Sequence, residues 1–436
     1  MFAEWLELDG ADAELAFVTP SGSLTWSDFV EQIRTNEKAF ADLSNQRVGL
    51  QLAPTTECLA RLFSLINSGS HLFLIAADAQ PDAMSEWATE FGLRSVFDPA
   101  GNQLEVSGPG KSATESAITI LTSGTTGKPK AVEHSLDSLV RPVRKHDAIR
   151  GTRWLLTFRP HLYAGLQVIM QCLFNHGTLV MPASGSDATQ VAQLAAGASV
   201  EFVSATPSYW RWLLTLAGED LAGMPLKQIT LGGEAVDQAT LDALRQKFSD
   251  ARLVHIYATT ELGRCFSVTD GMAGFPKRFL GELSPDGVEM KIEAGELVVR
   301  SANAMAGYDG TENVSPQQDW FCTGDMVEVV GDRVLFVGRK TDMINVGGNK
   351  VYPIEVETLI RSIPGVADAR VYGEASSMVG ELVKCDVVVM EGFVADDVEK
   401  SIREKTLAEL TNYQRPRFIS IVKEIPRTAA GKISRD

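Results

Sequence analysis

The chain has 436 residues, of which 44% are apolar and 22% charged, and its acidic residues outnumber the basic ones to give a net charge of −16. This composition is typical of a globular protein with two or three domains, and the charge argues against nucleic-acid binding. Because no apolar run approaches the ~18 residues of a membrane span and no signal peptide or CxxC pair is present, we expect a cytoplasmic monomer or homodimer with buried, reduced cysteines.

The first hundred residues alternate between short apolar runs and helical patterns. Residues 16–26 are typical of a hairpin, and Ser27 is expected to cap the helix that follows it. Strands are predicted over 47–52, 71–76 and 94–97, and helices over 28–43, 55–68 and 81–91. Strands that alternate with helices indicate βαβ units and a mostly parallel sheet.

A phosphate-binding type of loop follows the apolar strand expected over 117–121. Glycines allow the backbone to approach an anion closely, and successive N–H groups can form an anion-binding nest. The spacing does not fit the Walker P-loop, and taken alone the stretch could equally be a solvated surface loop. The residues concerned are Thr122, Ser123, Gly124, Thr125, Thr126, Gly127 and Lys128.

A second βα series and a β-rich segment complete the larger part of the chain. Strands are expected over 154–158, 178–181, 201–205, 228–231 and 253–257, with helices between them. Residues 281–338 are rich in β-branched residues and glycine, with a hairpin about residues 331–332. The predicted fold is α/β, with a large N-terminal domain over 1–338 of doubly wound βα layers and a β-rich subdomain at about 264–338.

The last hundred residues predict a separate unit. Helices are expected over 353–363 and 395–410, and strands over 368–373, 382–390 and 418–422. We therefore expect a small α+β C-terminal domain over 339–436, mobile relative to the first.

Five further short motifs follow the loop in a fixed order. They are residues 231–235 (LGGEA), 257–261 (YATTE), 323–325 (TGD), 338–342 (GRKTD) and 427–432 (RTAAGK). Together they resemble the adenylate-forming superfamily, which comprises acyl- and aryl-CoA synthetases, adenylation domains of peptide synthetases, and luciferase. The pattern is most similar to stand-alone acyl- and aryl-CoA ligases. Taken alone, Tyr257 would be a core residue, Asp325 a turn residue and Lys432 a solvated lysine.

The resemblance implies a nucleotide site for ATP. The loop at 122–128 would hold the β- and γ-phosphates, and Tyr257 would stack on adenine. Asp325 and Arg339 would bind the ribose hydroxyls. The turn that packs against adenine would comprise Gly233, Glu234 and Ala235.

The resemblance also implies the catalytic groups. Thr260 would contact the α-phosphate, Glu261 would bind Mg²⁺, and Lys432 would contact both the substrate carboxylate and the α-phosphate. Lys350 lies in a loop that would approach the site for the second step. At the expected hinge the family has Asp or Lys, whereas this chain has Thr341, so the hinge residue is not assigned.

The acid-binding residues are less clearly indicated. Residues 159–165 resemble the His-containing stretch of acyl- and aryl-CoA ligases and lack the Asp that binds an amino-acid substrate. Nearby aromatics would shorten the pocket, although we expect at least one of Trp210 and Trp212 to be core. The expected substrate is a small aromatic or short- to medium-chain carboxylic acid. The expected contacts are His161, Tyr163, Gly165, Thr206 and Leu262.

The predicted function is an ATP-dependent acid–thiol ligase that transfers the acyl group to coenzyme A. Two alternatives stay open: an adenylation enzyme that loads a separate phosphopantetheinyl carrier protein or forms an amide, and a non-catalytic nucleotide-binding homologue.

Overall fold

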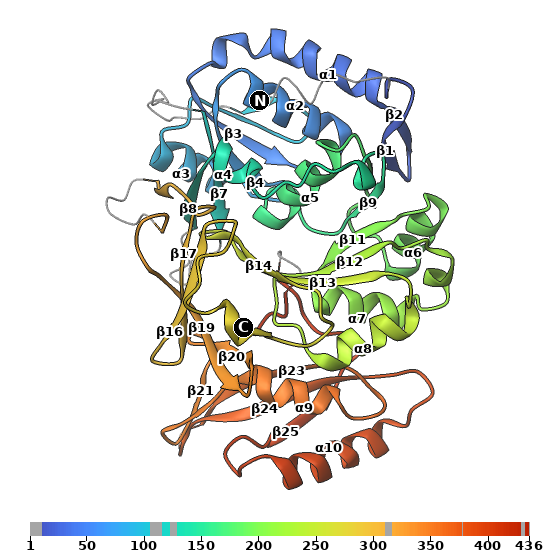
Figure 1. The fold of residues 1–436 in the computed structure, drawn as a ribbon, viewed down its shortest axis with the longest axis vertical. Helices are drawn as coiled ribbons and strands as arrows, with labels where there is room; N and C mark the ends of the chain where they lie inside the picture. Colours follow the sequence, from blue (N-terminus) through green and yellow to red (C-terminus); the bar gives the residue numbers. More distant parts are fainter. Residues whose placement is uncertain are drawn as a thin grey trace.

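The computed structural model describes residues 11–104, 116–122, 129–309, 316–376, 378–428 and 432–435. The structure has four β-sheets with helices packed beside them, and the sheet of β23, β24 and β25 lies at the bottom of Figure 1, below the other three. The first two sheets and a β-rich sheet form a large N-terminal domain, and the fourth belongs to a smaller C-terminal domain. The predicted α/β class is confirmed. Among the described helices, none combines the length and apolarity needed to cross a bilayer.

The first sheet has the strand order β18-β8-β7-β4-β3-β5-β6 and is parallel from β7 to β5. The interior strand β3 is buried along its whole length, as expected of a parallel strand covered on both faces. The strands are β3 (Arg47–Leu52), β4 (His71–Ala76), β5 (Ser95–Phe97), β6 (Gln103–Leu104), β7 (Ala117–Thr122), β8 (Lys130–Ser135) and β18 (Gly307–Tyr308). The helices of this region are α1 (Trp26–Ala39), α2 (Thr56–Asn67), α3 (Pro81–Phe91) and α4 (Leu136–Val140).

The second sheet has the order β14-β13-β12-β11-β9-β10-β1-β2. Its strands are β1 (Leu15–Thr19), β2 (Gly22–Thr25), β9 (Arg153–Leu156), β10 (Thr178–Val180), β11 (Phe202–Ala205), β12 (Gln228–Leu231), β13 (Arg252–Thr259) and β14 (Gly263–Val268). Its helices are α5 (Tyr163–Leu173), α6 (Ala188–Gly197), α7 (Pro207–Leu216) and α8 (Gln238–Lys247). One local prediction is wrong: α1 begins at Trp26, and its N-cap is Thr25 rather than Ser27.

The third sheet is antiparallel and has the order β15-β20-β19-β17-β16. Its strands are β15 (Phe275–Pro276), β16 (Val288–Glu293), β17 (Glu296–Ser301), β19 (Phe321–Val330) and β20 (Arg333–Arg339). Short 3₁₀ helices η2 (Ala41–Leu43), η3 (Asp147–Ile149), η4 (Asp220–Gly223) and η5 (Lys277–Phe279) lie in connections. The predicted β-rich part is therefore present.

The C-terminal sheet has a core of its own. Its strands are β21 (Ile344–Val346), β22 (Asn349–Val351), β23 (Val366–Ser376), β24 (Gly380–Val389) and β25 (Phe418–Ile421), with helices α9 (Pro353–Arg361) and α10 (Ala395–Glu409). Val356, Ile360, Val371 and Ile402 belong to one buried cluster there. The boundary at residue 339 stays a prediction. The marked C-terminus does not lie beside α10 but returns to the level of β20 (Figure 1).

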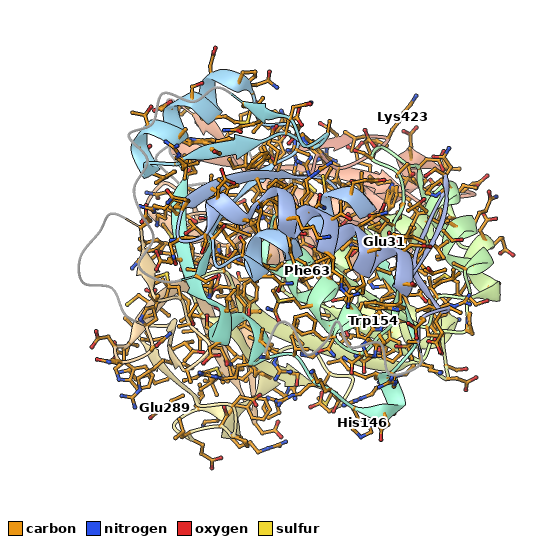
Figure 2. All side chains as sticks on the ribbon, turned by 90° about the horizontal axis from the view of Figure 1, so that it is seen from above. Glu31, Phe63, His146, Trp154, Glu289 and Lys423 are labelled. Carbon is orange, nitrogen blue, oxygen red and sulfur yellow. The ribbon has the colours of Figure 1, made fainter. Side chains whose placement is uncertain are left out.

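Large apolar side chains fill the interior of the N-terminal domain. Phe63 and Trp154 lie within its first core cluster, whereas Lys423 lies at the rim (Figure 2). Trp210 is fully buried and packs on Phe248, with ring centroids 5.8 Å apart, so the expectation of a core tryptophan is confirmed. Four cysteines are buried, but Cys322 is exposed, which corrects the expectation that all five are buried.

Candidate active site

The carboxyl ends of three parallel strands meet at one edge of the second sheet. β11, β12 and β13 are neighbours in parallel register. Thr206 directly follows β11, residues 232–234 follow β12, and Tyr257 lies near the end of β13. Gly233 has a φ of +84°, a conformation that favours glycine. Because open α/β sheets bind ligands beyond the carboxyl ends of their strands, the topology brings three predicted motifs to one candidate site.

Lys432 reaches this edge in a short hairpin at the end of the chain, which we call the tail hairpin (residues 426–434, described without 429–431). Within it, Arg427 and Ile433 form an antiparallel bridge, and the N–H of Thr428 donates to the carbonyl oxygen of Lys432 at 2.8 Å. A Cβ placed on Gly233 would lie 3.7 Å from Cε of Lys432. The predicted catalytic lysine therefore lies over the glycine turn that follows β12.

Several predicted site residues shift the pKa of Lys432. Loss of hydration and the positive charge of Arg339 lower the pKa of Lys432, although Glu234, Asp325 and Glu261 act in the opposite direction. The side chain retains solvent exposure, which limits the effect of desolvation. The structure thus gathers Lys432, Glu261 and Asp325, which come from three distant motifs, within electrostatic reach of one another.

Asp325 joins two other predicted nucleotide-binding residues. Its carboxylate accepts a hydrogen bond from the Tyr257 hydroxyl at 2.6 Å and one from Nε of Arg339 at 2.8 Å. Burial, and then the charge of Asp325, raise the pKa of Tyr257. The Tyr257 ring stacks on Phe266 and Phe336 at centroid distances of 5.4 and 5.1 Å. Ribose and adenine contacts at this cluster stay predictions.

The backbone around Thr260 and Glu261 is held from two sides. Nε2 of His134 donates to the carbonyl oxygen of Thr260 at 2.6 Å, because a carbonyl can only accept. Burial lowers the pKa of His134 to about 4, which keeps this imidazole neutral near pH 7. The N–H of Met305 donates to the carbonyl oxygen of Glu261 at 2.8 Å. The carboxylate of Glu261 is close enough to Tyr308 to contribute, after burial, to raising the pKa of that tyrosine to about 12.

A magnesium ion fits the donor chemistry at Glu261 only together with a nucleotide. Within the described ranges, no group of three or more His, Cys, Asp or Glu side chains could hold a metal on its own. Mg²⁺ usually takes one or two carboxylates and completes its shell with substrate phosphates and water. A single carboxylate at an edge that also carries the other predicted nucleotide-binding residues is compatible with that arrangement.

The residues predicted to bind the acid lie beside this edge. His161 and Tyr163 are each 6% exposed. Burial, and then the charge of Arg159, lower the pKa of His161 to about 4, so it offers a neutral ring. Gly165 has a structural role, since a Cβ there would lie 2.1 Å from the carbonyl oxygen of Arg159.

Leu262 and Thr206 are held in different ways. Leu262 is fully buried in the core cluster of the β-rich part. Thr206 caps α7 through a hydrogen bond that its Oγ1 accepts from the N–H of Tyr209 at 3.0 Å. Contact of either residue with an acid stays a prediction.

Two predicted parts of the site are not brought to this edge by the described contacts. Ser123 to Lys128 of the phosphate loop lie outside the described residues. Thr122 ends β7, and its Oγ1 donates to the carbonyl oxygen of Lys130 at 3.4 Å. Lys350 is exposed on the β21–β22 hairpin. In the part of the chain that the structure describes, no hydrogen bond or ion pair joins Lys350 to another predicted site residue.

A group of charged residues that the sequence motifs did not indicate links the two domains. Nε of Arg211 on α7 lies 3.0 Å from Oδ1 of Asp368 on β23, and Nε of Arg361 on α9 lies 3.1 Å from Oδ2 of Asp237. Arg211 also lies 3.5 Å from Asp237. All four side chains are at most 10% exposed. We call them the buried ion cluster, and no local sequence signal marks them because the partners from different domains are more than a hundred residues apart.

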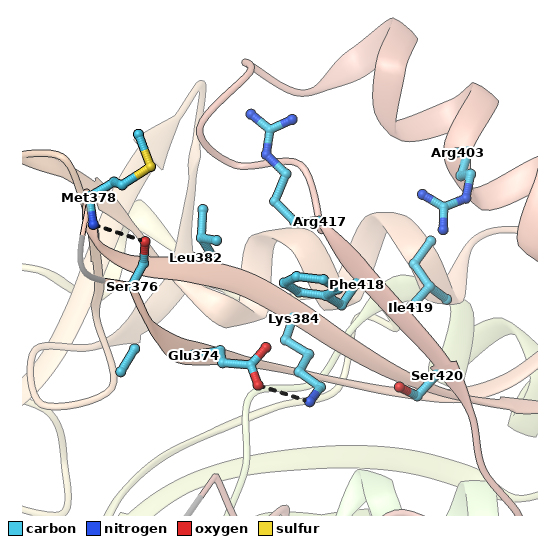
Figure 3. Close-up of a pocket in the computed structure, with 11 residues that line it drawn as sticks. Glu374, Ser376, Met378, Leu382, Lys384, Arg403, Arg417, Phe418, Ile419 and Ser420 are labelled. Carbon is cyan, nitrogen blue, oxygen red and sulfur yellow. Dashed lines mark hydrogen bonds and ion pairs between the residues drawn. The ribbon is translucent and has the colours of Figure 1, made fainter.

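A cavity of about 660 Å³ lies away from these motifs, on the C-terminal sheet. It is lined by residues of β23, β24 and β25 together with Met378, Arg403 and Arg417 (Figure 3). Lys384 in its wall is paired with Glu374 at 3.3 Å. No predicted site residue lines this cavity, so it is not the candidate active site.

Comparison with known proteins agrees with the geometry. Residues 99–309 match the model of the AMP-binding enzyme family, and residues 355–432 match the model of the AMP-binding enzyme C-terminal domain. The chain is 31% identical over 346 residues to a 4-chlorobenzoate–CoA ligase of Arthrobacter sp., covering 73% of this chain and 65% of that protein. It is 28% identical over 337 residues to the 2-succinylbenzoate–CoA ligase of Listeria innocua, covering 74% and 69% of the two chains.

A solved structure shows the same fold over the whole chain. The benzoate CoA ligase of Burkholderia xenovorans LB400 superposes with a TM-score of 0.81 at 18% identity, covering 100% of this chain and 98% of that one. The order of the motifs, their convergence on one sheet edge and these matches lead to one conclusion: the chain belongs to the AMP-binding, adenylate-forming enzyme family, and its curated relatives are acyl- and aryl-CoA ligases.

Proposed function

We propose that this protein is an ATP-dependent acid–thiol ligase that activates a small aromatic carboxylic acid and transfers its acyl group to coenzyme A. The observation that carries the proposal is the position of Lys432. The tail hairpin places this cation over the turn at Gly233, within electrostatic reach of Glu261 and Asp325. In the proposed reaction a carboxylate and a phosphate must meet at this point.

In the first step, a carboxylate oxygen of the acid attacks the α-phosphorus of ATP. The bond from that phosphorus to the bridging oxygen of pyrophosphate breaks, and an acyl adenylate forms. Both reactants are anions, so positive charge aimed at the developing charge lowers the barrier. Lys432 supplies a cation between them, and the Tyr257–Asp325–Arg339 cluster would hold the ribose.

Glu261 would provide the protein ligand for Mg²⁺, which supplies positive charge to the phosphate oxygens. Because His134 and Met305 fix the backbone on either side of its peptide, Glu261 is held in place before a nucleotide binds. Such preorganisation removes part of the entropic cost of assembling the reactants.

In the second step, the sulfur of a thiol attacks the acyl carbon, the bond to AMP breaks, and a thioester forms with loss of the thiol proton. Coenzyme A is the proposed acceptor because the curated relatives named above are CoA ligases. A small aromatic acid is favoured because those relatives act on substituted benzoates and because the neutral rings of His161 and Tyr163 border the site.

The test is acid-dependent exchange of pyrophosphate into ATP, run with Mg²⁺ over a panel of benzoates, arylacetates and short- to long-chain fatty acids. We expect exchange with at least one small aromatic acid and weak exchange with long-chain acids. Thioester formation with the best acid is then measured with coenzyme A, a holo-carrier protein and simple amines as competing acceptors. Folded protein that supports no exchange with any acid would contradict the proposal, and a product found only with carrier or amine would correct the acceptor.

A further inference from the structure

Glu234 makes contacts that differ from the role expected from its motif. Its Oε1 accepts a hydrogen bond from the N–H of Ile433 at 2.9 Å. Its Oε2 accepts hydrogen bonds from the hydroxyl and the N–H of Ser208 at 2.5 and 3.1 Å. Both carboxylate oxygens are therefore occupied by protein donors, one of which follows Lys432 directly in the chain.

We propose that Glu234 is a positioning residue that holds the tail hairpin so that Lys432 stays in the adenylation site. This inference rests on the proposed function, because it assigns a role within the first of its two half-reactions. Lys432 lies on the tail hairpin, and the N–H of the residue that follows it donates to this carboxylate of the N-terminal domain. A hydrogen bond from a backbone N–H to a charged acceptor is among the stronger hydrogen bonds in proteins.

The contact also connects the tail hairpin to the buried ion cluster. The Ser208 hydroxyl that donates to Glu234 accepts a hydrogen bond from Nη2 of Arg211 at 3.0 Å. Arg211 in turn binds Asp368 on β23. One continuous set of contacts therefore links the residue after Lys432, through Glu234, Ser208 and Arg211, to the C-terminal sheet.

Measuring the two half-reactions separately distinguishes a misplaced Lys432 from a general loss of active protein. In Glu234→Ala, Ile433 loses its acceptor while Lys432 itself is unchanged. We expect kcat for acid-dependent adenylation to fall at least about tenfold, the loss expected when a hydrogen bond to a charged group is removed. Thioester formation from preformed acyl adenylate and coenzyme A should stay within about twofold, because Lys432 acts on the phosphate transfer. Glu234→Gln, which keeps two acceptor lone pairs on one oxygen, should recover part of the adenylation rate.

Glu201 offers a matched control. Its carboxylate also accepts a backbone hydrogen bond, from the N–H of Arg153 at 3.0 Å, and pairs with Lys227, and both of these partners belong to the N-terminal domain. Glu201→Ala should leave the ratio of the two half-reactions unchanged. A direct readout is hydrogen exchange at the amide of Ile433, which we expect to speed up in Glu234→Ala and not in Glu201→Ala.

Three outcomes would overturn the inference: unchanged adenylation in Glu234→Ala, an equal loss in both half-reactions, or a rise in KM for ATP with kcat preserved. The last would mean that Glu234 contacts the nucleotide, as its motif suggests. Failure of the proposed function would be seen in the wild-type protein, which would then form no acyl adenylate from any acid.

Discussion

Lys432 should give adenylation an unusual alkaline limit. Only the protonated amine can stabilise the phosphate and carboxylate charges, and desolvation together with Arg339 lowers its pKa from the ordinary 10.5. Its charge is therefore lost at a lower pH than that of a free lysine, and the adenylation rate should fall as pH rises through the lowered pKa. The measurement is kcat for pyrophosphate exchange between about pH 7 and 10.

Replacing Lys432 by arginine keeps the positive charge but removes its titration in this pH range. Lys432→Arg stays protonated over the whole range, so its remaining activity should not show the alkaline fall, whereas Lys432→Ala should lose most adenylation at every pH. The assignment is wrong if the wild-type rate stays flat to about pH 10 or if Lys432→Arg shows the same fall.

Asp325 provides a second test at the scale of one side chain. Asp325→Asn removes the charge that Arg339 binds, and it leaves a single carbonyl oxygen to accept from Tyr257. If Asp325 also binds the ribose, KM for ATP should rise by about tenfold or more, since charge-assisted hydrogen bonds are roughly twice as strong as neutral ones. Tyr257→Phe removes one partner of Asp325 and leaves the carboxylate, so it should raise KM less. Equal KM values for Asp325→Asn and the wild type would remove the ribose role.

At the scale of elements, the parallel core and the hairpins β1–β2 and β19–β20 could be predicted from sequence, whereas the antiparallel strand β8 could not. β3 and β4 have the predicted bounds because each is a short, mostly apolar stretch that is buried along nearly all of its length. β8 was missed because its sequence mixes Lys130, Glu133 and His134 with apolar residues, and its pairing with β7 and β18 makes it a strand. β16 carries an alternating pattern that could have been recognised.

The candidate site likewise contains features that could be predicted from sequence and features that could not. The motifs that follow β11, β12 and β13 lie at one edge of the second sheet because adjacent parallel strands end there, whereas their roles in the site stay predictions. The contact between Glu234 and Ile433 joins residues 199 positions apart, and no periodicity or motif encodes it. The role of His134, which fastens β8 and α4 to Thr260, was hidden for the same reason.

This histidine makes the packing of β8 dependent on pH. Its folded-state pKa is about 4, below the unfolded value of 6.5, so between these values the unfolded chain binds more protons. The contribution of His134 to the free energy of unfolding is therefore fully present above pH 6.5 and is lost as pH falls toward 4. His134→Gln keeps a donor for Thr260 and does not titrate, so between pH 7 and 4 it should lose less stability than the wild type, by up to ~3 kcal/mol. Urea unfolding at several pH values measures this difference, and parallel curves for the two proteins would contradict it.

At the scale of the whole molecule, the buried ion cluster fixes how the C-terminal sheet sits on α7 and α8. Burial alone would raise the pKa of Asp237, but Arg361 and Arg211 lower it, and three carboxylates of the second domain and its interface surround Arg361. Removing one member of such a group leaves a buried charge unpaired, which costs ~3–5 kcal/mol. Separating the two domains should therefore cost more free energy than separating an interface held by exposed polar contacts.

A double-mutant cycle across the interface tests this directly. Arg211→Met and Asp368→Asn each break the 3.0 Å pair, and the double variant removes both charges, so a coupling of ~1–3 kcal/mol in the free energy of unfolding is expected. The matched pair is Glu399 and Arg403, four residues apart on α10 and largely exposed, whose coupling should be only ~0.3–0.5 kcal/mol. Raising the salt to about 1 M should weaken the exposed pair and leave the buried coupling nearly unchanged, because salt screens buried charges much less. A small coupling between Arg211 and Asp368, or one that salt removes, would mean that the two domains are held by other contacts and that the position of Lys432 does not depend on this cluster.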